Sequence, residues 1–149
     1  MAILLQKKLS ETEPTILIDG DVIRDILKLS SLNDKKSRLK IAYIYSDLAN
    51  LIQSQGVNVV CATISLFHEI HNYNREIFVQ YNEIFLKKDL DMLFKEDKNK
   101  IYSRSLNNET KVVGVNIKAE YPKTPSLVIN IDNKIDFNTL IDRILDIKI

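Results

Sequence analysis

Four short apolar runs alternate along the chain with segments of helical periodicity, and this alternation is the feature that most restricts the possible folds. The runs are TILID, VNVVCATI, EIFLK and SLVINI. They are rich in β-branched residues and nearly continuous in apolarity, which is typical of strands covered on both faces of a parallel sheet. Strands that alternate with helices predict an α/β domain, with a ligand site beyond the carboxyl ends of the strands.

Five helical patterns lie between and around these strands. In the clearest, apolar residues from Ile41 to Ile52 recur at the i, i+3, i+4, i+7 spacing, and Gly56 ends it. The others end near Leu9, run around residues 70–81, run from residue 90 to about 106, and place Phe137, Leu140, Ile141, Ile144 and Leu145 on one face.

Length and charge narrow the class of protein. The 149 residues, 45% of them hydrophobic, are enough for one globular domain spanning 1–149. Twenty-one basic and 20 acidic residues leave no overall field that would draw the protein to nucleic acid or a membrane. No apolar stretch approaches the roughly 20 residues of a membrane span, and MAILLQKKL is wrongly flanked for a signal peptide. We therefore expect a cytoplasmic protein.

A single cysteine, Cys61, lies inside VNVVCATI. One cysteine cannot form an intrachain disulfide, which fits a reducing compartment. Because free cysteines are usually buried, Cys61 is expected to be a small core residue.

Charged side chains gather where the first strand ends. TILID is followed by Gly-Asp and then by VIRDILKL, which begins a helix. Asp19, Asp21 and Arg24 are therefore expected together at the mouth of the ligand site. The alternative interpretation is structural: Asp21 caps the helix, and Asp19 only ends the strand.

The second strand also ends in polar residues. Ser65 follows VNVVCATI, and the polar segment HEIHNYNREIF then resumes a helix, of which Ser65 could be the N-cap. His68 and His71 could share a helix face beside Glu69, but a zinc site needs a further well-spaced ligand. We expect both histidines to be surface helix residues.

Five segments, taken in order, resemble the adenylylsulfate kinase family. They are IDGDVIR, KKSRLK with Arg38, ATISLF, EDKNKIY and AEYPKTPSLVI. The family has a DGD turn with an arginine three residues on, a second arginine before the next helix, a strand ending in ISP, a lid segment DPKGLY, and YE.P..P.L. The resemblance covers roughly residues 2–131 and implies a three-layer P-loop kinase-like domain with a mostly parallel sheet.

The resemblance implies transfer of the terminal phosphoryl group of ATP to the ribose 3′-hydroxyl of adenylylsulfate, a step of sulfate assimilation, with Mg²⁺ as the charge partner. Asp19 and Asp21 would orient the metal and the acceptor hydroxyl, with Asp21 as the metal ligand. Arg24 and Arg38 would grip the acceptor nucleotide, with Ile64 in the same subsite. The family also implies a possible homodimer.

Two further groups of residues receive roles by resemblance. Ser65 matches a serine described in the family as a phosphorylated intermediate, although direct transfer needs only a hydrogen bond from this hydroxyl to the substrate. The lid would run over about 95–118, and Lys98, Lys100 and Arg104 would close over phosphates.

The first departure from the family pattern is the phosphate cradle. No G-x-x-x-x-G-K-[ST] occurs in the chain, and MAILLQKKL resembles the helix that directly follows such a loop. We therefore expect the first strand and the phosphate loop, about twenty residues, to be missing upstream. The neighbours of that interior strand would have open edges, and the chain as given would transfer phosphate poorly or not at all.

The second departure concerns the acceptor. Where the family has DR.ENIRR, this chain keeps Arg38 but places Ile41 for the asparagine, and Tyr43 and Ile44 for the arginine pair. Leu66 replaces the proline of ISP, and DKNKIY replaces DPKGLY. These changes predict a related activated nucleotide, such as a cytidine diphosphate derivative that carries a phosphoramidate group.

Two other interpretations stay open from the sequence. One is a catalytically inactive nucleotide-binding or regulatory domain that has lost the ATP site. The other is a structural α/β module in which Asp19, Asp21 and Arg24 form a surface ion network that contributes little stability.

Overall fold

The computed structural model describes residues 1–29, 31–97, 100–107, 109–131 and 136–147. These residues fall into two compact units, which are described separately. The amino-terminal unit comprises Met1–Ser65 and Glu69–Val79, and the carboxy-terminal unit comprises Leu66–His68 and Gln80–Ile149. Within the described residues, no helix is long and apolar enough to cross a membrane.

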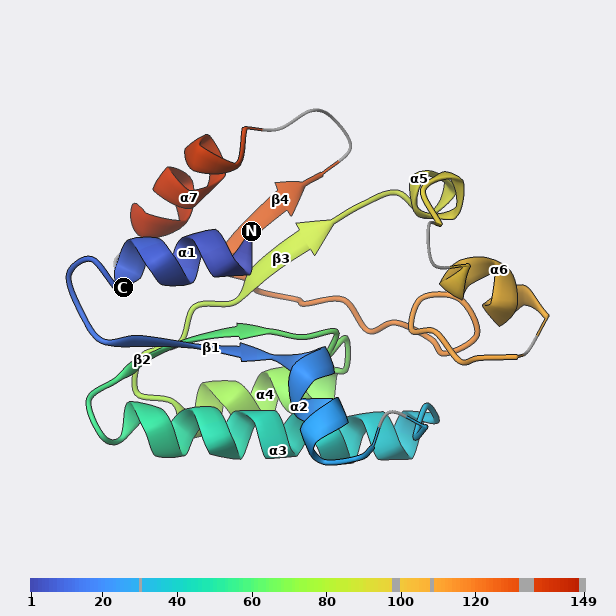
Figure 1. Ribbon diagram of the computed structural model, residues 1–149, viewed down its shortest axis with the longest axis horizontal. Helices are drawn as coiled ribbons and strands as arrows, with labels where there is room; N and C mark the ends of the chain where they lie inside the picture. The colour runs from blue at the N-terminus through green and yellow to red at the C-terminus, as the bar shows by residue number, and fades with distance from the viewer. Residues whose placement is uncertain (30, 98–99, 108, 132–135, 148–149) are drawn as a thin grey trace. The chain divides into compact units, whose positions relative to one another are not determined.

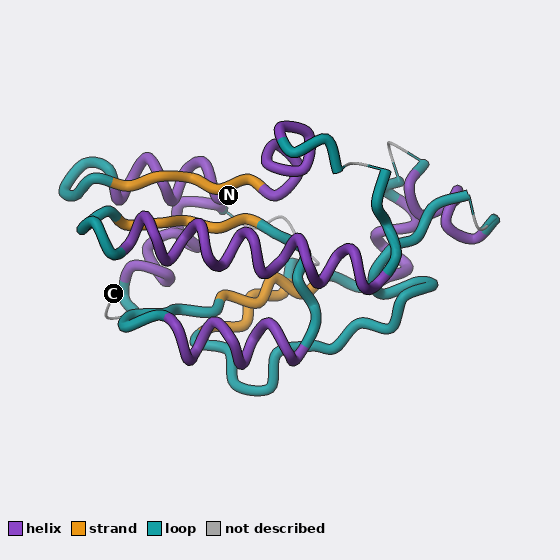
Figure 2. Tube along the Cα trace, turned by 90° about the horizontal axis from the view of Figure 1, so that it is seen from below, coloured by secondary structure: helices purple, strands orange, loops and turns teal. Residues whose placement is uncertain are grey.

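The amino-terminal unit is a layered α/β structure. Its strands, β1 (Thr15–Asp19) and β2 (Asn58–Ala62), are parallel, with Thr15 opposite Asn58 and Asp19 opposite Ala62. Both strands contact helix α1 (Ala2–Leu9), and β2 contacts helix α3 (Lys35–Gln53). The two helices lie on opposite sides of the strand pair (Figure 1), and α3 runs along it (Figure 2). Helix α2 (Gly20–Ile26) follows β1 directly, and α4 (His68–Ile77) follows β2 after a short loop.

Helix α3 forms because its ends are defined and one face is apolar. At its amino end, the Asp34 carboxylate accepts a hydrogen bond from the Ser37 amide at 3.1 Å. After its carboxyl end, Gly56 adopts a φ of +78°, which favours glycine. The apolar face packs into the core of the unit, which contains Ile18, Ile41, Tyr45 and Ala49. The helix predicted from Ile41 to Ile52 is thereby confirmed.

The carboxy-terminal unit contains the second strand pair. Strands β3 (Ile84–Lys87) and β4 (Leu127–Asn130) are parallel, with Ile84 opposite Leu127. Helices α5 (Leu90–Lys95) and α6 (Ile101–Leu106) lie between them in the chain, and α7 (Phe137–Leu145) follows β4. The buried residues of this unit include Ile129, Leu140, Ile141 and Ile144. The apolar face predicted for the last helix is confirmed.

Several sequence predictions need correction. The single helix expected over 90–106 is two short helices, because Lys100 has a left-handed φ of 53° and Asp97 accepts hydrogen bonds from the amides of Tyr102 and Ser103. The helix expected around 70–81 runs over His68–Ile77. The strands are parallel as predicted, and the described residues form two pairs, β1 with β2 and β3 with β4.

Cys61 is not a core residue, contrary to the prediction from the sequence. It lies in β2, opposite Ile18 of β1, and is exposed, whereas Ile18 is 1% exposed. Because the described sheet of this unit has only two strands, few of its residues can be covered by helices. The core consists of Ile18 and the apolar face of α3.

Candidate functional site

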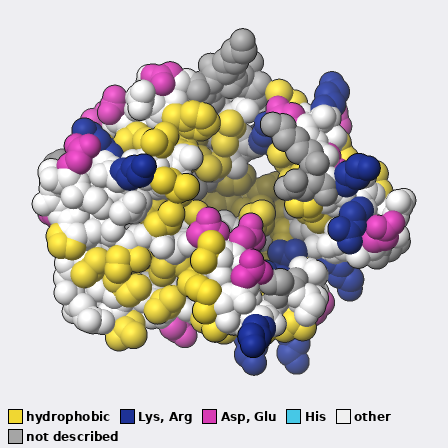
Figure 3. All heavy atoms as spheres, in the orientation of Figure 1, with side chains coloured by type: hydrophobic (Ala, Val, Ile, Leu, Met, Phe, Trp, Pro, Cys, Tyr) yellow, Lys and Arg dark blue, Asp and Glu magenta, His cyan; other side chains and the backbone are white. Residues whose placement is uncertain are grey.

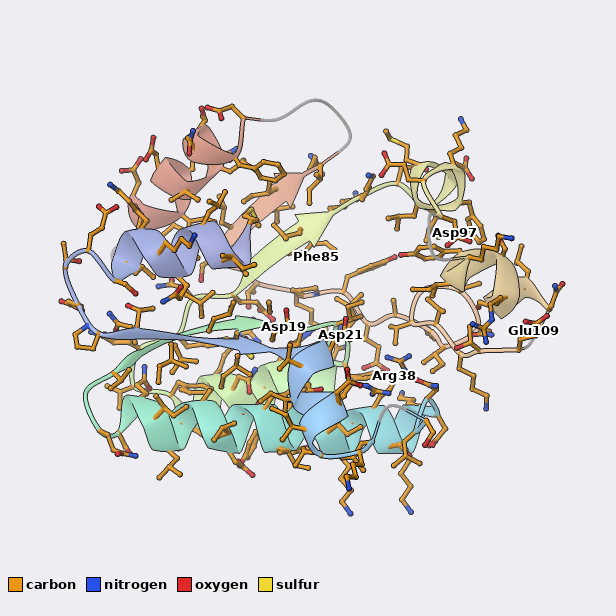
Figure 4. The ribbon with its side chains drawn as sticks, viewed as in Figure 1. Asp19, Asp21, Arg38, Phe85, Asp97 and Glu109 are labelled. Carbon is orange, nitrogen blue, oxygen red and sulfur yellow. The ribbon has the colours of Figure 1, made fainter. Side chains whose placement is uncertain are left out.

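The carboxyl end of β1 turns directly into helix α2. Asp19 is the N-cap of this helix, and its carboxylate accepts hydrogen bonds from the amides of Asp21 at 2.9 Å and Val22 at 3.4 Å. The capping residue is therefore Asp19 and not Asp21, contrary to the structural alternative. Asp21 stands exposed in the first turn of α2 (Figure 4). Acidic side chains gather at the surface over this helix (Figure 3).

Gly20 packs this turn closely against the end of β2. The Tyr45 hydroxyl donates a hydrogen bond to the Gly20 carbonyl oxygen at 2.7 Å. A Cβ atom on Gly20 would lie 3.1 Å from Cγ2 of Thr63 and 3.3 Å from the carbonyl oxygen of Ala62. The turn that carries Asp21 is thus fixed from two sides, by α3 and by the end of β2.

Two arginines converge on the loop between α2 and α3. Arg24, from α2, donates through Nη2 to the carbonyl oxygen of Leu32 at 2.9 Å and to Oδ1 of Asn33 at 3.1 Å. Arg38, from α3, donates through Nη2 to the same Oδ1 at 3.4 Å and through Nε to the Asn33 carbonyl oxygen at 3.1 Å. The structure therefore brings together the two predicted arginines.

The charges of this group influence one another. Burial lowers the pKa of the Arg38 guanidinium, the like charge of Arg24 lowers it further, and the carboxylate of Asp21 acts in the opposite direction. Arginine keeps its charge throughout the physiological range. Asp21, Arg24 and Arg38 thus form one electrostatically connected cluster beside the carboxyl end of β1.

The predicted residues Ile64 and Ser65 follow directly after Thr63, the residue that borders the Gly20 turn. Ser65 donates through Oγ to Oγ1 of Thr63 at 3.1 Å, and it does not cap α4, which begins at His68. Ile64 is 67% exposed. His71 is buried rather than on the surface, and its Nε2 hydrogen-bonds the carbonyl oxygen of Ser65 at 2.8 Å. This buried imidazole supports the loop that presents Ser65.

His68 binds within the carboxy-terminal unit. Its amide donates to Oε2 of Glu120 at 2.9 Å, and its ring Nε2 lies 2.9 Å from the carbonyl oxygen of Tyr121. The Tyr121 ring in turn contacts Phe85 of β3, with centroids 5.5 Å apart. His68 and His71 therefore have separate structural partners.

The donor set suits a magnesium ion better than zinc. In the part of the chain that the structure describes, no three His, Cys, Asp or Glu side chains gather as a metal site. Magnesium keeps several water ligands and is commonly bound through one or two carboxylates and the phosphates of a substrate. The exposed carboxylate of Asp21 is compatible with that mode of binding.

The predicted lid residues belong to the carboxy-terminal unit. Lys98 lies outside the described residues. Lys100 precedes α6, and Arg104 lies on α6, where its Nε is 3.3 Å from Oε2 of Glu109. Both side chains of this ion pair are more than half exposed, so it contributes little to stability. Figure 4 labels Asp97, which accepts a hydrogen bond from the Ser103 amide, and Glu109, which accepts one from Nε of Arg104.

Three residues of the amino-terminal cluster were not predicted: Asn33, Tyr45 and Thr63. Tyr45 had a usable signal, because it lies seven residues after Arg38 and hence on the same face of the helix. Asn33 had none, since an asparagine before a helix suggests only a loop. Its contacts depend on how two helices meet.

A change of Tyr45 to phenylalanine tests how the turn is held. Burial is the main cause that raises the Tyr45 pKa to about 12. A raised pKa in the folded state favours the protonated form, so its contribution to stability is complete below pH 10 and is lost as the pH rises through 12. We expect Tyr45→Phe to cost about 1 kcal/mol at pH 7 and to flatten the fall in stability between pH 10 and 12. Urea unfolding over this pH range measures both effects. An identical pH dependence in the variant would contradict this assignment.

Comparison with known proteins identifies the family. The protein-family model for adenylylsulphate kinase matches residues 1–130. A cytidine diphosphoramidate kinase of Campylobacter jejuni is 37% identical over 77% of this chain and 67% of its own length. An adenylyl-sulfate kinase of Bacillus velezensis is 34% identical over 77% of this chain and 60% of its own length. The chain therefore spans only about three fifths to two thirds of these relatives.

A solved structure agrees with the fold. The APS kinase CysC of Mycobacterium tuberculosis, in complex with AMPPNP and APS, superposes with a TM-score of 0.85. The alignment covers 98% of this chain and 87% of that one, at 22% identity, and so it supports the fold alone. The three-layer P-loop kinase fold expected from the sequence is thereby confirmed. By the family model and the two curated relatives together, this chain belongs to the adenylylsulphate kinase family.

Proposed function

We propose that this chain is part of a kinase that transfers the terminal phosphoryl group of ATP to a ribose hydroxyl of an activated nucleotide. The observation that carries the proposal is the cluster at the end of β1. There, one exposed carboxylate, Asp21, lies within electrostatic reach of the half-buried guanidinium groups of Arg24 and Arg38. Phosphoryl transfer depends mainly on positioning and charge stabilisation, and this cluster supplies both.

Each side chain has a distinct task in this proposal. Asp21 orients the acceptor hydroxyl and holds magnesium, which when bound neutralises charge on the transferring phosphate. Asp19 fixes the turn through its two hydrogen bonds to amides of α2. Arg24 and Arg38 bind the anionic groups of the acceptor, because guanidinium matches phosphate oxygens in a bidentate geometry.

Ser65 and Ile64 complete the acceptor side of the proposed site. The Ser65 hydroxyl donates its one proton to Thr63, and its lone pairs can accept a hydrogen bond from a substrate. A covalent phosphoserine is not required, since the phosphoryl group can pass directly between oxygens. The exposed Ile64 side chain offers apolar contact to a nucleoside. Lys100 and Arg104 stay proposed phosphate contacts of the lid.

For the acceptor, we propose a phosphoramidate nucleotide of cytidine. Ile41, which replaces an asparagine of the family pattern, is 2% exposed in the core. Tyr43, which replaces an arginine, donates its hydroxyl to Glu69 at 2.7 Å. Neither position supplies the cation or amide that the family pattern places there. The name of the Campylobacter jejuni relative favours the same acceptor.

The experiment compares two acceptors with the protein in the form that its source cell produces. ADP release is measured with Mg-ATP and either cytidine diphosphoramidate or adenylylsulfate. We expect kcat/KM to be higher for the cytidine compound. A higher kcat/KM for adenylylsulfate would reject this choice of acceptor. No ADP release with either acceptor would reject the proposed kinase activity.

A second candidate is a nucleotide-binding domain without transferase activity. It is favoured by one observation, that G-x-x-x-x-G-K-[ST] does not occur among the 149 residues. Titration of this chain with ATP separates the two candidates. Measurable ATP affinity would count against a domain that has lost the ATP site.

A further inference from the structure

Asn33 occupies the centre of the two-arginine cluster. Its Oδ1 accepts hydrogen bonds from Nη2 of Arg24 at 3.1 Å and from Nη2 of Arg38 at 3.4 Å. Its backbone carbonyl oxygen accepts a third, from Nε of Arg38 at 3.1 Å. Through this one residue, a guanidinium on α2 is joined to a guanidinium on α3.

The chemical type of this acceptor matters. Two guanidinium groups that share one acceptor atom repel each other, which agrees with the effect of Arg24 on the pKa of Arg38. A carboxylate at this position would hold both groups but would cancel one of their charges. The carboxamide of Asn33 is neutral, and so it holds the two cations while leaving their charge available to an anion.

We infer that Asn33 is a positioning residue that fixes Arg24 and Arg38 as one binding pair for a doubly charged group, such as the diphosphate of a nucleotide. This inference rests on the proposed function, because it assigns the pair to the acceptor side of that site. Asn33 acts through the two arginines and does not itself touch the reacting atoms.

The other contacts of the arginines limit the expected effect. Arg24 also donates to the carbonyl oxygens of Leu29 and Leu32, and Arg38 keeps its bond to the backbone of residue 33 in any variant. Loss of the carboxamide therefore removes one of three acceptors of Nη2 of Arg24 and one acceptor of Nη2 of Arg38, while the bonds to backbone carbonyls remain. Binding of a doubly charged anion should weaken without being abolished.

Asn33→Leu is the principal variant, and Asn58→Leu is its matched control. Asn58 likewise hydrogen-bonds a charged side chain through its carboxamide, donating to Oε2 of Glu13 at 2.7 Å, but it lies at the amino end of β2, opposite Thr15. Calorimetric titration with inorganic pyrophosphate should give a dissociation constant about tenfold higher for Asn33→Leu and within about twofold of wild type for Asn58→Leu. In the kinase assay, KM for the nucleotide acceptor should rise by a similar factor with kcat nearly unchanged.

Asn33→Asp separates position from charge. Its carboxylate can accept the same hydrogen bonds, so the Nη2–Hη2 signals of Arg38 in ¹H–¹⁵N spectra should stay sharp, whereas they should broaden in Asn33→Leu. Pyrophosphate affinity should nevertheless fall in Asn33→Asp, because the added charge opposes the anion. A merely structural role of Asn33 would lower the melting temperature without this division between spectrum and affinity.

Two results would overturn the inference. One is unchanged pyrophosphate affinity in Asn33→Leu when Arg24→Leu abolishes binding, and the other is no pyrophosphate binding by the wild-type protein. Failure of the proposed function gives a different pattern. In that case pyrophosphate binding would depend on Asn33 as expected, but no phosphoryl transfer to either nucleotide would be detected.

Discussion

Replacement of Asp21 by asparagine is expected to lower kcat for phosphoryl transfer about a thousandfold and to leave the melting temperature within about 2 °C of the wild-type value. The side chain is exposed, and among the described residues its carboxylate accepts no hydrogen bond. The cap of α2 is supplied by Asp19, so the helix does not depend on residue 21. The loss should therefore fall on chemistry and not on folding.

Asp25→Asn provides the matched control for this experiment. Asp25 lies four residues further along the same helix and is also exposed, so the variant removes an equal charge one turn away. Its kcat should stay within about threefold of wild type, because only the long-range field changes. Equal losses in the two variants would show that the net charge of α2 matters and not the carboxylate of Asp21. A normal kcat in Asp21→Asn would remove Asp21 from the proposed site.

The parts of the fold that could be predicted are those defined by local patterns. The runs around Ile18 and Val59 are β-branched and apolar, and they form the parallel pair β1 and β2. The apolar spacing from Ile41 onward specifies α3, and Gly56 marks the turn after it. In each case the residues that determine the element lie within it or directly beside it, so the sequence alone carries the signal.

The parts that could not be predicted depend on contacts between distant residues. The break between α5 and α6 follows from the left-handed backbone of Lys100 and from Asp97, which accepts two amides of the next helix. No periodicity within residues 90–106 distinguishes this arrangement from one helix. The burial of His71 likewise depends on its bond to the Ser65 carbonyl oxygen.

The candidate site shows the same division. Asp21, Arg24 and Arg38 could be proposed because they follow a strand and match a family pattern in order. Asn33 and Thr63 could not, because their importance depends on residues far away in the sequence. Asn33 binds two guanidinium groups, and Thr63 lies where only a glycine at residue 20 fits. Sequence reasoning could propose the charged groups of the site but not the residues that hold them in place.

Gly20→Val should reduce the free energy of unfolding by about 3 kcal/mol and should also abolish nucleotide binding. Gly20 has no positive φ in this structure, so the reason is space and not backbone conformation. Its Cβ would lie 3.1 Å from Cγ2 of Thr63 and 3.3 Å from the backbone oxygen of Ala62, and the branched side chain of valine would add further overlap. To relieve it, the turn must move away from β2, and Asp21 would move with it.

Thr63→Ser tests this steric explanation directly, because it removes the Cγ2 atom and keeps the hydroxyl that accepts a bond from Ser65. The double variant Gly20→Val, Thr63→Ser should recover about 1 kcal/mol relative to Gly20→Val alone, with the remainder due to the immovable carbonyl of Ala62. Urea unfolding of the two single variants and the double variant measures this coupling. Strict additivity would mean that Thr63 does not set the limit at this turn. Because a Gly→Val change alters stability by less than about 1 kcal/mol through helix propensity, most of a loss of the expected size comes from the close approach of this turn to the end of β2.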